Sequence, residues 1–466
     1  MTIHYQIPAD IPQSVFRTYD IRGEVDPFLT PDLLYAIGLA IGAEAHDCQQ
    51  KTLAIGRDGR MSSPTLFPAL AQGLLESGCD LIDIGIVPTP LLYFATHWLK
   101  TGSGVMLTAS HNPADYNGVK VVLNHTTLFE AKIQTLYQRI INRQLVYAKT
   151  PGQLTTTDLA EAYINRITSD VHLTKPLKIV VDAGNGVAGH LAPALFRRMG
   201  CEVIELYCDI DGRFPNHHPD PGEVKNLKDL QAAVAQHQAA LGLAFDGDAD
   251  RLGVVTNRGE IIWPDRQMML FARDVLSRNP HAEIIFDVKC SRYLPQVIAQ
   301  NHGIPLMWKT GHSILKGKMQ ERNAPLAGEM SGHIFFKERW YGFDDGIYAA
   351  ARLLEILSRE TGTASAVFQT FPNSVNTPEL KLPVPEAKKL AFMETFLRQA
   401  QFDGKITTLD GMRVDFPDGW GLLRVSNTSP CLTLRFEADD ASALQRIQAL
   451  FRAQLLAVDP TVQLPF

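Results

Sequence analysis

The 466-residue sequence lacks several features that define specialised classes of protein. Its six cysteines form no C-x-x-C pair, so we expect buried free thiols. The formal net charge is −6, which disfavours a non-specific nucleic-acid binder. The most apolar stretch, residues 81–99, is interrupted by two prolines, an aspartate and a histidine. No segment therefore reaches the roughly 20 apolar residues of a membrane span.

The first 16 residues also lack the basic end and apolar run of a secretory signal, so we expect a cytoplasmic protein. The composition is that of a packed globular protein, with 45% apolar and 20% charged residues. At roughly 150 residues per domain, the length predicts three or four domains.

One pattern of short apolar strands and helix-like runs occurs three times. Each copy has a first strand, a polar loop, a helix-like run, a second strand and, further on, a third strand. The three strands are expected at 53–55, 81–84 and 104–107 in the first copy, at 179–181, 203–206 and 241–245 in the second, and at 284–286, 306–308 and 325–327 in the third. Strands that alternate with helices indicate parallel β-α-β units. We therefore expect three similar α/β domains.

The remainder breaks this pattern and predicts a smaller α+β domain, with a helix at 386–399 and strands such as 422–425 and 432–436. The expected domains are 1–155, 156–258, 259–371 and 372–466. A polar motif follows the third strand of each repeat, and ligands bind beyond the carboxyl ends of such strands. The motifs are therefore expected to face one central cleft.

The strongest chemical signal is an acidic motif at residues 246–251 (DGDADR). Asp246, Asp248 and Asp250 are spaced by two, which puts their carboxylates on one side of an extended loop. Such charges repel one another unless a cation lies among them. Oxygen ligands favour Mg2+, Mn2+ or Ca2+ over Zn2+, and the spacing does not fit an EF-hand. A solvated acidic turn is the alternative.

Ser110 follows another buried strand, within residues 108–113 (TASHNP). It is either a turn residue or a nucleophile, and the metal-type motif elsewhere favours the second interpretation. A phosphoserine would supply an oxygen ligand to the cation. No G-x-S-x-G surrounds it, so the hydrolase geometry is not indicated.

Two further motifs carry groups suited to sugars and phosphates. Residues 328–333 (GEMSGH) present Glu329, Ser331 and His333, and a carboxylate and a hydroxyl at this spacing could bind adjacent sugar hydroxyls. Residues 424–428 (RVSNT) combine one guanidinium with hydroxyl and amide donors, as a phosphate requires. Each motif alone is equally compatible with a polar turn.

Two nucleotide-type patterns compete with this interpretation. Residues 184–189 (GNGVAG) fit the dinucleotide fingerprint, with Glu205 about 20 residues further on. A tight turn at residues 184–189 is the better interpretation. Asp182 lies at the end of the preceding strand, and a dinucleotide site would explain neither the acidic triplet nor the repeats. Residues 311–318 resemble a P-loop, but five residues separate the glycines and Met319 stands where Ser or Thr is needed. A nucleotide-driven kinase is therefore disfavoured.

Taken together, the four motifs resemble the α-D-phosphohexomutase superfamily, over essentially the whole chain and in the same order. Met330 in the third motif is similar to the bacterial phosphomannomutase/phosphoglucomutase branch, whereas the phosphoglucosamine mutase branch typically has glutamine there. The resemblance implies three similar α/β domains with mixed sheets and a smaller C-terminal α+β domain around a central cleft.

The resemblance also implies roles for individual residues. Ser110 would be the phosphorylated serine and would bind one Mg2+ together with Asp246, Asp248 and Asp250. The groups expected to act in catalysis are Ser110, His111, Lys120, Arg22, Arg251 and His333. The groups expected to contact the substrate are Tyr19, Lys289, His312, Glu329, Ser331, Arg424, Ser426, Asn427 and Thr428.

The implied reaction interconverts hexose 1-phosphates and hexose 6-phosphates of mannose or glucose through a phosphoserine. A bound hexose 1,6-bisphosphate would be both intermediate and activator. Lys120, His111 and His333 are all candidates for the acid and the base. A phosphoglucosamine mutase, a metal-dependent phosphatase and an NAD-dependent oxidoreductase remain as alternatives. We expect sugar phosphates as partners, no nucleic acid or membrane, and a monomer or weak oligomer.

Overall fold

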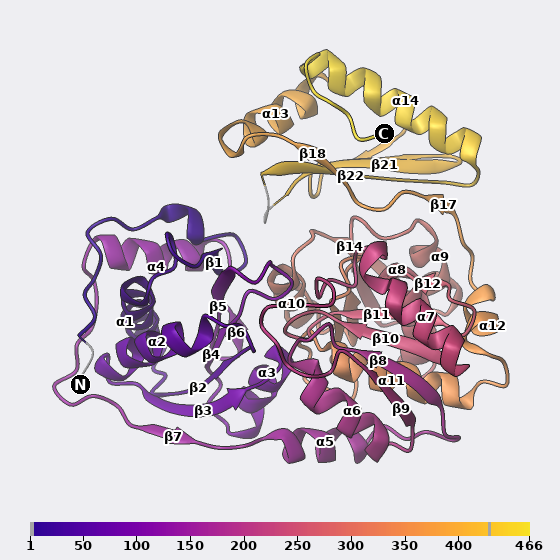
Figure 1. Cartoon of the computed structure of the whole chain (residues 1–466). Coiled ribbons are helices and arrows are strands. Elements are labelled where there is room, and N and C mark those ends of the chain that lie inside the picture. The colour runs from indigo at the N-terminus through magenta and orange to yellow at the C-terminus, as the bar shows by residue number, and fades with distance from the viewer. Residues whose placement is uncertain (1–3, 427–429) are drawn as a thin grey trace.

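The structure, a computed structural model, describes residues 4–426 and 430–466. Within these ranges the strands form four sheets, each with its own helices. Figure 1 shows that the unit at the C-terminal end stands apart from the other three. In the same ranges, no helix combines the length and apolar character needed to cross a membrane.

The first sheet and its helices come from the N-terminal part of the chain. Its strands are β1 Ile21–Glu24, β2 Thr52–Arg57, β3 Asp80–Ile86, β4 Gly104–Leu107, β5 Tyr116–Leu123, β6 Thr126–Thr127 and β7 Leu154–Thr156, and its helices are η1 Gln13–Val15, α1 Pro31–Asp47, α2 Ser63–Glu76, α3 Thr89–Trp98 and α4 Ala131–Ile141. The strand order is β1-β5-β4-β2-β3-β7, with β6 beside β5. β2 is parallel to β3 and β4, and β5 is antiparallel to β4.

The central strands of this sheet are buried on both faces, because helices cover both. Leu53 and Ile55 of β2 pack into the apolar cluster that contains α1 and α2. Ala54, between them in sequence, packs into the cluster that contains α3. The two-residue period of the strand thus supplies both helix layers, as expected for an α/β/α sandwich.

The second unit has strands β8 Lys178–Asp182, β9 Glu202–Leu206, β10 Leu241–Phe245, β11 Leu252–Thr256 and β12 Ile261–Ile262, and helices α5 Ala160–Thr168, α6 Ala188–Arg198, η2 Val224–Leu227 and α7 Lys228–His237. Its strand order is β12-β11-β10-β8-β9. β8 is parallel to β9 and β10, and β11 is antiparallel to β10.

The third unit has strands β13 Glu283–Asp287, β14 Ile304–Trp308, β15 Leu326–Gly328 and β16 Ile334–Phe336, and helices α8 Pro264–Leu276, α9 Tyr293–Gln300, α10 His312–Arg322, α11 Gly346–Arg359 and α12 Ala364–Gln369. Its strand order is β14-β13-β15-β16. β13 is parallel to both neighbours, and β16 is antiparallel to β15.

The same core arrangement therefore occurs three times. In each copy the first strand of the repeat lies between the second and the third, and an antiparallel strand follows the third. The predicted repeat and the mixed sheets are confirmed. The third strands β4, β10 and β15 lead directly into the three polar motifs.

The C-terminal unit is an antiparallel sheet with two helices, as the predicted α+β domain requires. Its strands are β17 Val375–Asn376, β18 Leu380–Pro383, β19 Lys405–Thr407, β20 Met412–Phe416, β21 Gly419–Val425 and β22 Cys431–Ala438, and its helices are α13 Glu386–Gln399 and α14 Ala441–Val458. The order is β17-β22-β21-β20-β19, with β18 beside β22.

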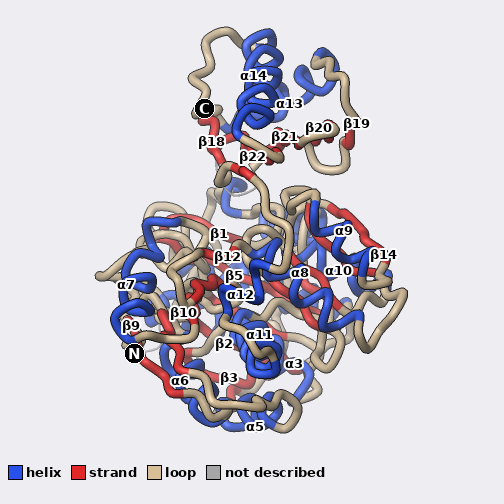
Figure 2. Tube along the Cα trace, turned by 90° about the vertical axis from the view of Figure 1, so that its right-hand side faces the viewer, coloured by secondary structure: helices blue, strands red, loops and turns tan. Residues whose placement is uncertain are grey.

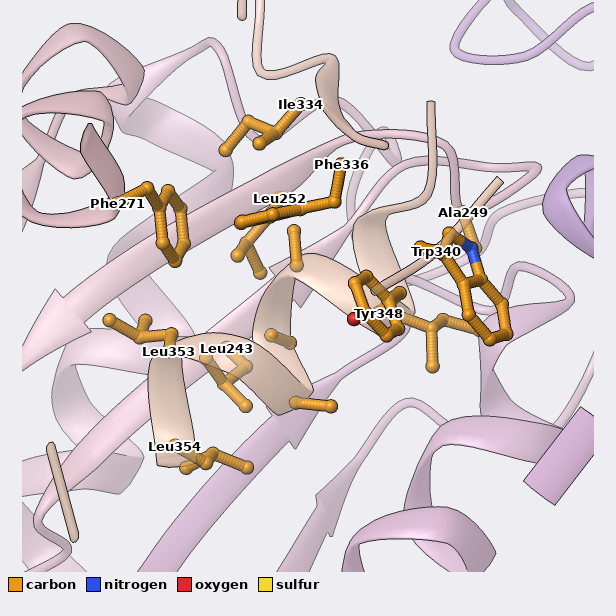
Figure 3. Close-up of a cluster of buried hydrophobic side chains, with 14 of the residues drawn as sticks. Leu243, Ala249, Leu252, Phe271, Ile334, Phe336, Trp340, Tyr348, Leu353 and Leu354 are labelled. Carbon is orange, nitrogen blue, oxygen red and sulfur yellow. The ribbon is translucent and has the colours of Figure 1, made fainter. Parts of the chain in front are cut away.

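The apolar core distinguishes the C-terminal unit from the rest. One cluster of buried side chains joins all three α/β units, from Phe94 of α3 through Phe196 of α6 to Phe271 of α8. Figure 3 shows part of it around α11, where Trp340 stacks on Tyr348 with ring centroids 4.4 Å apart. The C-terminal unit has a separate apolar cluster of its own.

Contacts between the C-terminal unit and the third unit combine hydrogen bonds with one small apolar cluster of Val288, Trp420 and Leu422. Arg413 donates to the carbonyl oxygens of Val288 and Cys290, at 2.7 and 2.9 Å. Ser291 donates its hydroxyl to Glu437 at 2.9 Å. This apolar cluster is much smaller than the core that joins the other three units, so the C-terminal unit is the one best suited to move.

Phe271 offers a test of the shared core. It is fully buried and packs edge-on against Phe336, with ring centroids 5.1 Å apart. Phe271→Ala should lower the free energy of unfolding by about 3–5 kcal/mol, because it removes buried area and leaves a cavity. Urea denaturation followed by circular dichroism measures this loss. Phe28→Ala, at a side chain that is 42% exposed, should change the free energy by about 0.5 kcal/mol or less. Equal losses of unfolding free energy in the two variants would contradict the placement of Phe271 in the shared core.

Candidate active site

Ser110 lies where the first α/β unit meets the second. It follows β4, has a positive φ of 51° and is 2% exposed. Its hydroxyl donates to Asp246 Oδ2 at 2.8 Å, and Oγ lies 3.1 Å from His111 Nδ1. The left-handed backbone turns the side chain out of the strand direction and toward the acidic loop. The structure thus brings together two motifs that lie 136 residues apart.

The backbone around Ser110 is held by a buried arginine. The Arg60 guanidinium donates to the carbonyl oxygens of Ser110 at 2.8 Å and Asn112 at 2.7 Å. Asp58 accepts from Arg60 Nε at 3.1 Å and from the Thr108 hydroxyl at 2.7 Å. This charged pair fixes the serine loop before any ligand binds, which is the preorganisation that phosphoryl transfer requires.

The three aspartates of the acidic loop form a buried cluster. Asp246, Asp248 and Asp250 are fully buried, and each offers one oxygen within 4.8 Å of the others. Among the described residues, Oδ1 of Asp248 and Oδ1 of Asp250 are buried and have no hydrogen-bond partner. Buried carboxylate oxygens without partners are costly, and an oxygen-only set of donors suits a hard divalent cation. The cluster therefore fits a metal ion.

Lys120 offsets part of this negative charge. Its ammonium lies 2.7 Å from Asp248 Oδ2 and 2.6 Å from Asp250 Oδ2. Burial alone would lower the pKa of Lys120, but these two carboxylates raise it well above its usual range. Burial raises the pKa of Asp246, and the neighbouring Asp250 and Asp248 raise it further.

The acidic loop touches the serine loop so closely that only glycine fits at position 247. A Cβ atom there would lie 2.4 Å from the Ser110 carbonyl oxygen. The glycines of the dinucleotide-like segment serve the same packing. A Cβ at Gly186 would lie 2.8 Å from the Gly247 carbonyl oxygen, and one at Gly189 would lie 1.8 Å from the Cys208 carbonyl oxygen. These glycines therefore permit close backbone contacts.

The third motif reaches the same place from the third unit. Glu329 is buried and accepts hydrogen bonds from the Gly311 backbone NH and from Ser331 Oγ, the latter at 3.2 Å. Burial raises the pKa of Glu329. Arg251, at the end of the acidic motif, donates from Nε to His333 Nε2 at 3.0 Å. The second and third motifs are therefore in direct contact.

Residues 311–318 have no P-loop geometry, because α10 begins at His312 and continues through them. Gly311 has a φ of 137°, and a Cβ there would lie 2.5 Å from the Tyr19 ring. Tyr19 donates its hydroxyl to the Thr310 carbonyl oxygen at 2.7 Å. The His312 ring stacks on His333 at 5.2 Å, and burial holds the pKa of His312 well below its usual range.

Two further expected site residues form salt bridges, one within the first unit and one between the third and fourth units. Arg22 donates to Asn112 Oδ1 at 2.7 Å and also pairs with Asp20. Lys289, from the third unit, lies 2.9 Å from Glu379 Oε2 in the fourth.

Arg424 is the one arginine of the fourth motif, and it is buried. Its Nε donates to Asp410 Oδ2 at 3.1 Å. The same oxygen accepts the Thr310 backbone NH at 3.0 Å. Asp410 therefore joins the fourth motif to the third unit, next to the Tyr19 contact. The Ser426 carbonyl oxygen accepts from the buried Lys389 at 2.8 Å. Asn427 and Thr428 lie outside the described residues.

Several groups at this site were not predicted from the sequence. Thr89 donates its hydroxyl to Asp248 Oδ2 at 2.6 Å. Asp58 and Arg60 were assigned only to a polar loop, although an Asp follows the first strand in all three repeats. Asp410 and Asp344 carry no spacing signal that distinguishes them from turn residues.

Comparison with known families agrees with this geometry. Models of phosphoglucomutase/phosphomannomutase alpha/beta/alpha domains I, II and III match residues 13–146, 161–259 and 263–374. The model of the C-terminal domain of the same enzymes matches residues 379–454. The chain belongs to the phosphoglucomutase/phosphomannomutase family.

Full-length relatives carry the same names. The chain is 56% identical over 457 residues to a phosphomannomutase/phosphoglucomutase of Pseudomonas aeruginosa, covering 98% of each chain. It is 51% identical over 448 residues to a phosphoglucomutase of Neisseria meningitidis, covering 96% of this chain and 97% of the other. A crystal structure of a family member from Burkholderia thailandensis has 50% identity and a TM-score of 0.92, and covers 98% of this chain and 100% of that chain. The predicted family and its bacterial phosphomannomutase/phosphoglucomutase branch are confirmed.

The contact between the serine and acidic loops can be tested with Gly247→Ala. The added methyl group meets the Ser110 carbonyl oxygen, so the two loops must separate. We expect sugar phosphate turnover to fall by about 10²-fold, as misplacement of reacting groups by about 1 Å does elsewhere. Gly362→Ala is the matched control, because its Cβ meets only the Ala366 methyl group at 3.3 Å. Full activity of Gly247→Ala would show that this contact does not position Ser110.

Proposed function

We propose that this chain is a phosphohexomutase that interconverts hexose 1-phosphates and 6-phosphates of mannose and glucose. The observation that carries the proposal is the 2.8 Å hydrogen bond from the Ser110 hydroxyl to Asp246, within a buried triad of aspartates. A serine in that place can carry a phosphoryl group whose charge a cation on the triad would neutralise. The family and the names of its full-length relatives support the same activity.

The cofactor we propose is one Mg2+ held by Asp246, Asp248, Asp250 and the phosphorylated Ser110. Two of the three carboxylates have a buried oxygen without a partner, and all the donors are oxygen. When bound, the cation would withdraw charge from the phosphoryl group during transfer. Lys120 contacts the Oδ2 atoms of Asp248 and Asp250, which leaves the Oδ1 atom of each carboxylate for the cation.

In the proposed transfer, a sugar hydroxyl oxygen forms a bond to phosphorus while the bond from phosphorus to Ser110 Oγ breaks. Arg251 Nε, which donates to His333 Nε2, turns to the phosphoryl group, the hydroxyl proton passes to the freed Nε2, and Ser110 Oγ receives a proton in return. Lys120, which is protonated, and His111, whose Nδ1 lies 3.1 Å from Oγ, are the groups able to return it. Arg22 and Arg251 add positive charge near the serine loop. Transfer of this kind depends on positioning and charge neutralisation more than on covalent assistance.

The same site must then accept the sugar in two orientations, since the intermediate is a hexose 1,6-bisphosphate. We propose that Glu329 and Ser331 hold the sugar hydroxyls, with Lys289, His312 and Tyr19 beside them. The phosphate far from Ser110 would bind to the 424–428 motif, with Arg424, Ser426, Asn427 and Thr428 as its ligands. In that complex Arg424 exchanges Asp410 for phosphate, which has more charge and matches the guanidinium equally well.

The C-terminal unit is the proposed lid over this site. Its interface with the third unit, made of hydrogen bonds and one small apolar cluster, supports such movement, and closure would keep water from the phosphoserine. We also propose that the protein is a cytoplasmic monomer or weak oligomer. Its six cysteines form no disulfide in the structure, as is usual in a reducing compartment.

A substrate panel tests the proposed activity. Mannose 1-phosphate and glucose 1-phosphate should be converted to their 6-phosphates with Mg2+ and catalytic glucose 1,6-bisphosphate, and EDTA should abolish the conversion. Coupled assays and phosphorus NMR follow the products. Preference for glucosamine 1-phosphate would identify a phosphoglucosamine mutase. Release of inorganic phosphate without isomerisation would identify a phosphatase, and NAD reduction an oxidoreductase.

The phosphoserine is tested by the mass of the intact protein. After incubation with glucose 1,6-bisphosphate, the protein should gain the mass of one phosphoryl group, and Ser110→Ala should gain none. Turnover of Ser110→Ala should fall by about 10³-fold or more, because the variant lacks the phosphoryl carrier. Ser103→Ala, at another buried serine close to the same strand, is the control and should still accept the group. Phosphorylation of Ser110→Ala to the same extent as the wild type would refute Ser110 as the phosphorylated residue.

A further inference from the structure

The hydrogen bond that the His333 ring receives from Arg251 determines which ring nitrogen carries a proton. Nε2 lies 3.0 Å from Arg251 Nε. A guanidinium only donates hydrogen bonds, so Nε2 must accept. In the neutral ring the proton is then on Nδ1. His333 is 3% exposed, so solvent hardly contributes to this choice.

Nδ1 faces two buried carboxylates. It lies at ion-pair distance from both, 3.1 Å from Asp344 Oδ2 and 3.4 Å from Asp250 Oδ1, although among the described residues neither contact has the angles of a hydrogen bond. Asp250 belongs to the acidic triad and also contacts Lys120. Asp344 belongs to no predicted motif, and it is the nearer of the two to His333. It is fully buried in the loop before α11.

A lysine balances the charge of Asp344 from the opposite side. Lys316 Nζ donates to Asp344 Oδ1 at 2.9 Å and lies 4.1 Å from the centre of the Tyr93 ring. Burial would raise the pKa of Asp344, but Lys316 and the two neighbouring histidines hold it well below its usual range. Lys316 lies in the segment that resembles a P-loop, so this salt bridge gives that segment a role without a nucleotide.

We propose that Asp344 is a positioning residue for the mutase reaction, which holds His333 as the Nδ1-protonated tautomer and leaves Nε2 as the proton acceptor. Lys316 keeps the Asp344 carboxylate ionised and in place. The inference rests on the proposed function, since it assigns the orientation of one base within that reaction. An Nε2-protonated ring would have no lone pair on that nitrogen to accept the hydroxyl proton.

The position of Nε2 supports this role. Arg251 Nε, which it contacts, lies 3.8 Å from Asp246 Oδ2, and that oxygen accepts the Ser110 hydroxyl. Nε2 therefore lies on the side of the ring where the phosphoryl group is transferred, while Asp344 lies on the other side. A carboxylate behind a histidine, with the reacting group in front, is the arrangement that fixes the tautomer in serine hydrolases.

The same three groups also have the composition of a cation site, because donor atoms of Asp250, His333 and Asp344 lie within 4.8 Å of one another. The contact with Arg251 indicates that His333 Nδ1 carries a proton and does not bind a cation. A cation on Nδ1 would need that nitrogen unprotonated, and Nε2 would then carry the proton and oppose the Arg251 donor.

The adjacent Asp345 provides a matched control. It is as deeply buried as Asp344, but its side chain accepts the Tyr348 backbone NH at 2.8 Å and so caps α11. It also accepts the hydroxyl of Tyr163 at 2.8–2.9 Å. Among the described residues, Asp344 forms an ion pair with His333 and Asp345 forms none. Its role is structural, whereas the one we propose for Asp344 is positional.

The test compares Asp344→Asn with Asp345→Asn in the Mg2+-loaded full chain, with glucose 1-phosphate as substrate. An asparagine keeps the shape but can donate to Nδ1, which favours the wrong tautomer. We expect kcat of Asp344→Asn to fall by about 10²–10⁴-fold. KM should stay within about threefold, because the sugar contacts are intact. Asp345→Asn should lower the melting temperature and keep kcat at 20 °C within about threefold.

A spectroscopic measurement separates positioning from general damage. Nitrogen-15 NMR of labelled histidine, with the His333 signals identified by their loss in His333→Gln, reports which ring nitrogen is protonated. The wild type should be protonated on Nδ1, and Asp344→Asn should shift toward Nε2. Lys316→Met should also lower kcat, by a smaller factor than Asp344→Asn does.

The outcomes distinguish this inference from the proposed function. An inactive wild type would refute the proposed function itself. An active wild type with unchanged kcat in Asp344→Asn, or with His333 protonated on Nε2, would overturn only the role of Asp344. Equal loss of kcat in Asp344→Asn and Asp345→Asn would show that the loop before α11 acts through folding alone.

Discussion

The contact between the serine loop and the acidic loop is the constraint on which the rest of the structure depends. It joins Ser110 of the first unit to Asp246 of the second at 2.8 Å, and it requires glycine at position 247. Neither loop forms the site alone. The shared apolar core holds the units rigidly enough to keep these loops together, and the Asp58–Arg60 pair fixes the serine backbone. Catalysis that depends on positioning requires this rigidity, because small displacements of the reacting groups greatly reduce the reaction rate.

Charge balance is the second organising feature. The buried aspartates of the acidic loop would repel one another in a low-dielectric site, so cationic side chains surround them. Lys120 lies between Asp248 and Asp250, and Arg251 bridges Asp246 to His333. Behind this layer, Asp344 and Lys316 form another buried pair. The site therefore alternates positive and negative groups from the serine to the far side of α10. A charged side chain that moves in this site leaves its partner without a counter-charge, so neighbouring charged side chains move together.

The C-terminal unit is attached to the rest of the structure differently from the three α/β units, which share one apolar core. It has an apolar core of its own, and it contacts the third unit through hydrogen bonds, salt bridges and one small apolar cluster. Arg424 and Lys289, which we propose as substrate ligands, are paired with Asp410 and Glu379. A phosphorylated sugar would compete with these carboxylates for the same cations. Substrate binding and the position of this unit are therefore coupled.

The sequence by itself determined the repeat, the strands and the motifs. Apolar runs of fixed spacing identified β2, β8 and β13, and the polar groups after β4, β10 and β15 pointed to a shared site. These signals are local, since burial of a strand and the turn after it depend on neighbouring residues. Only the tertiary structure decided which distant groups meet. Asp344, Asp410 and Thr89 have no local pattern, because their partners lie far away along the chain. The glycines at 184–189 fit a dinucleotide fingerprint in sequence, yet they serve close packing, because the Gly247 carbonyl lies against Gly186 and the Cys208 carbonyl against Gly189.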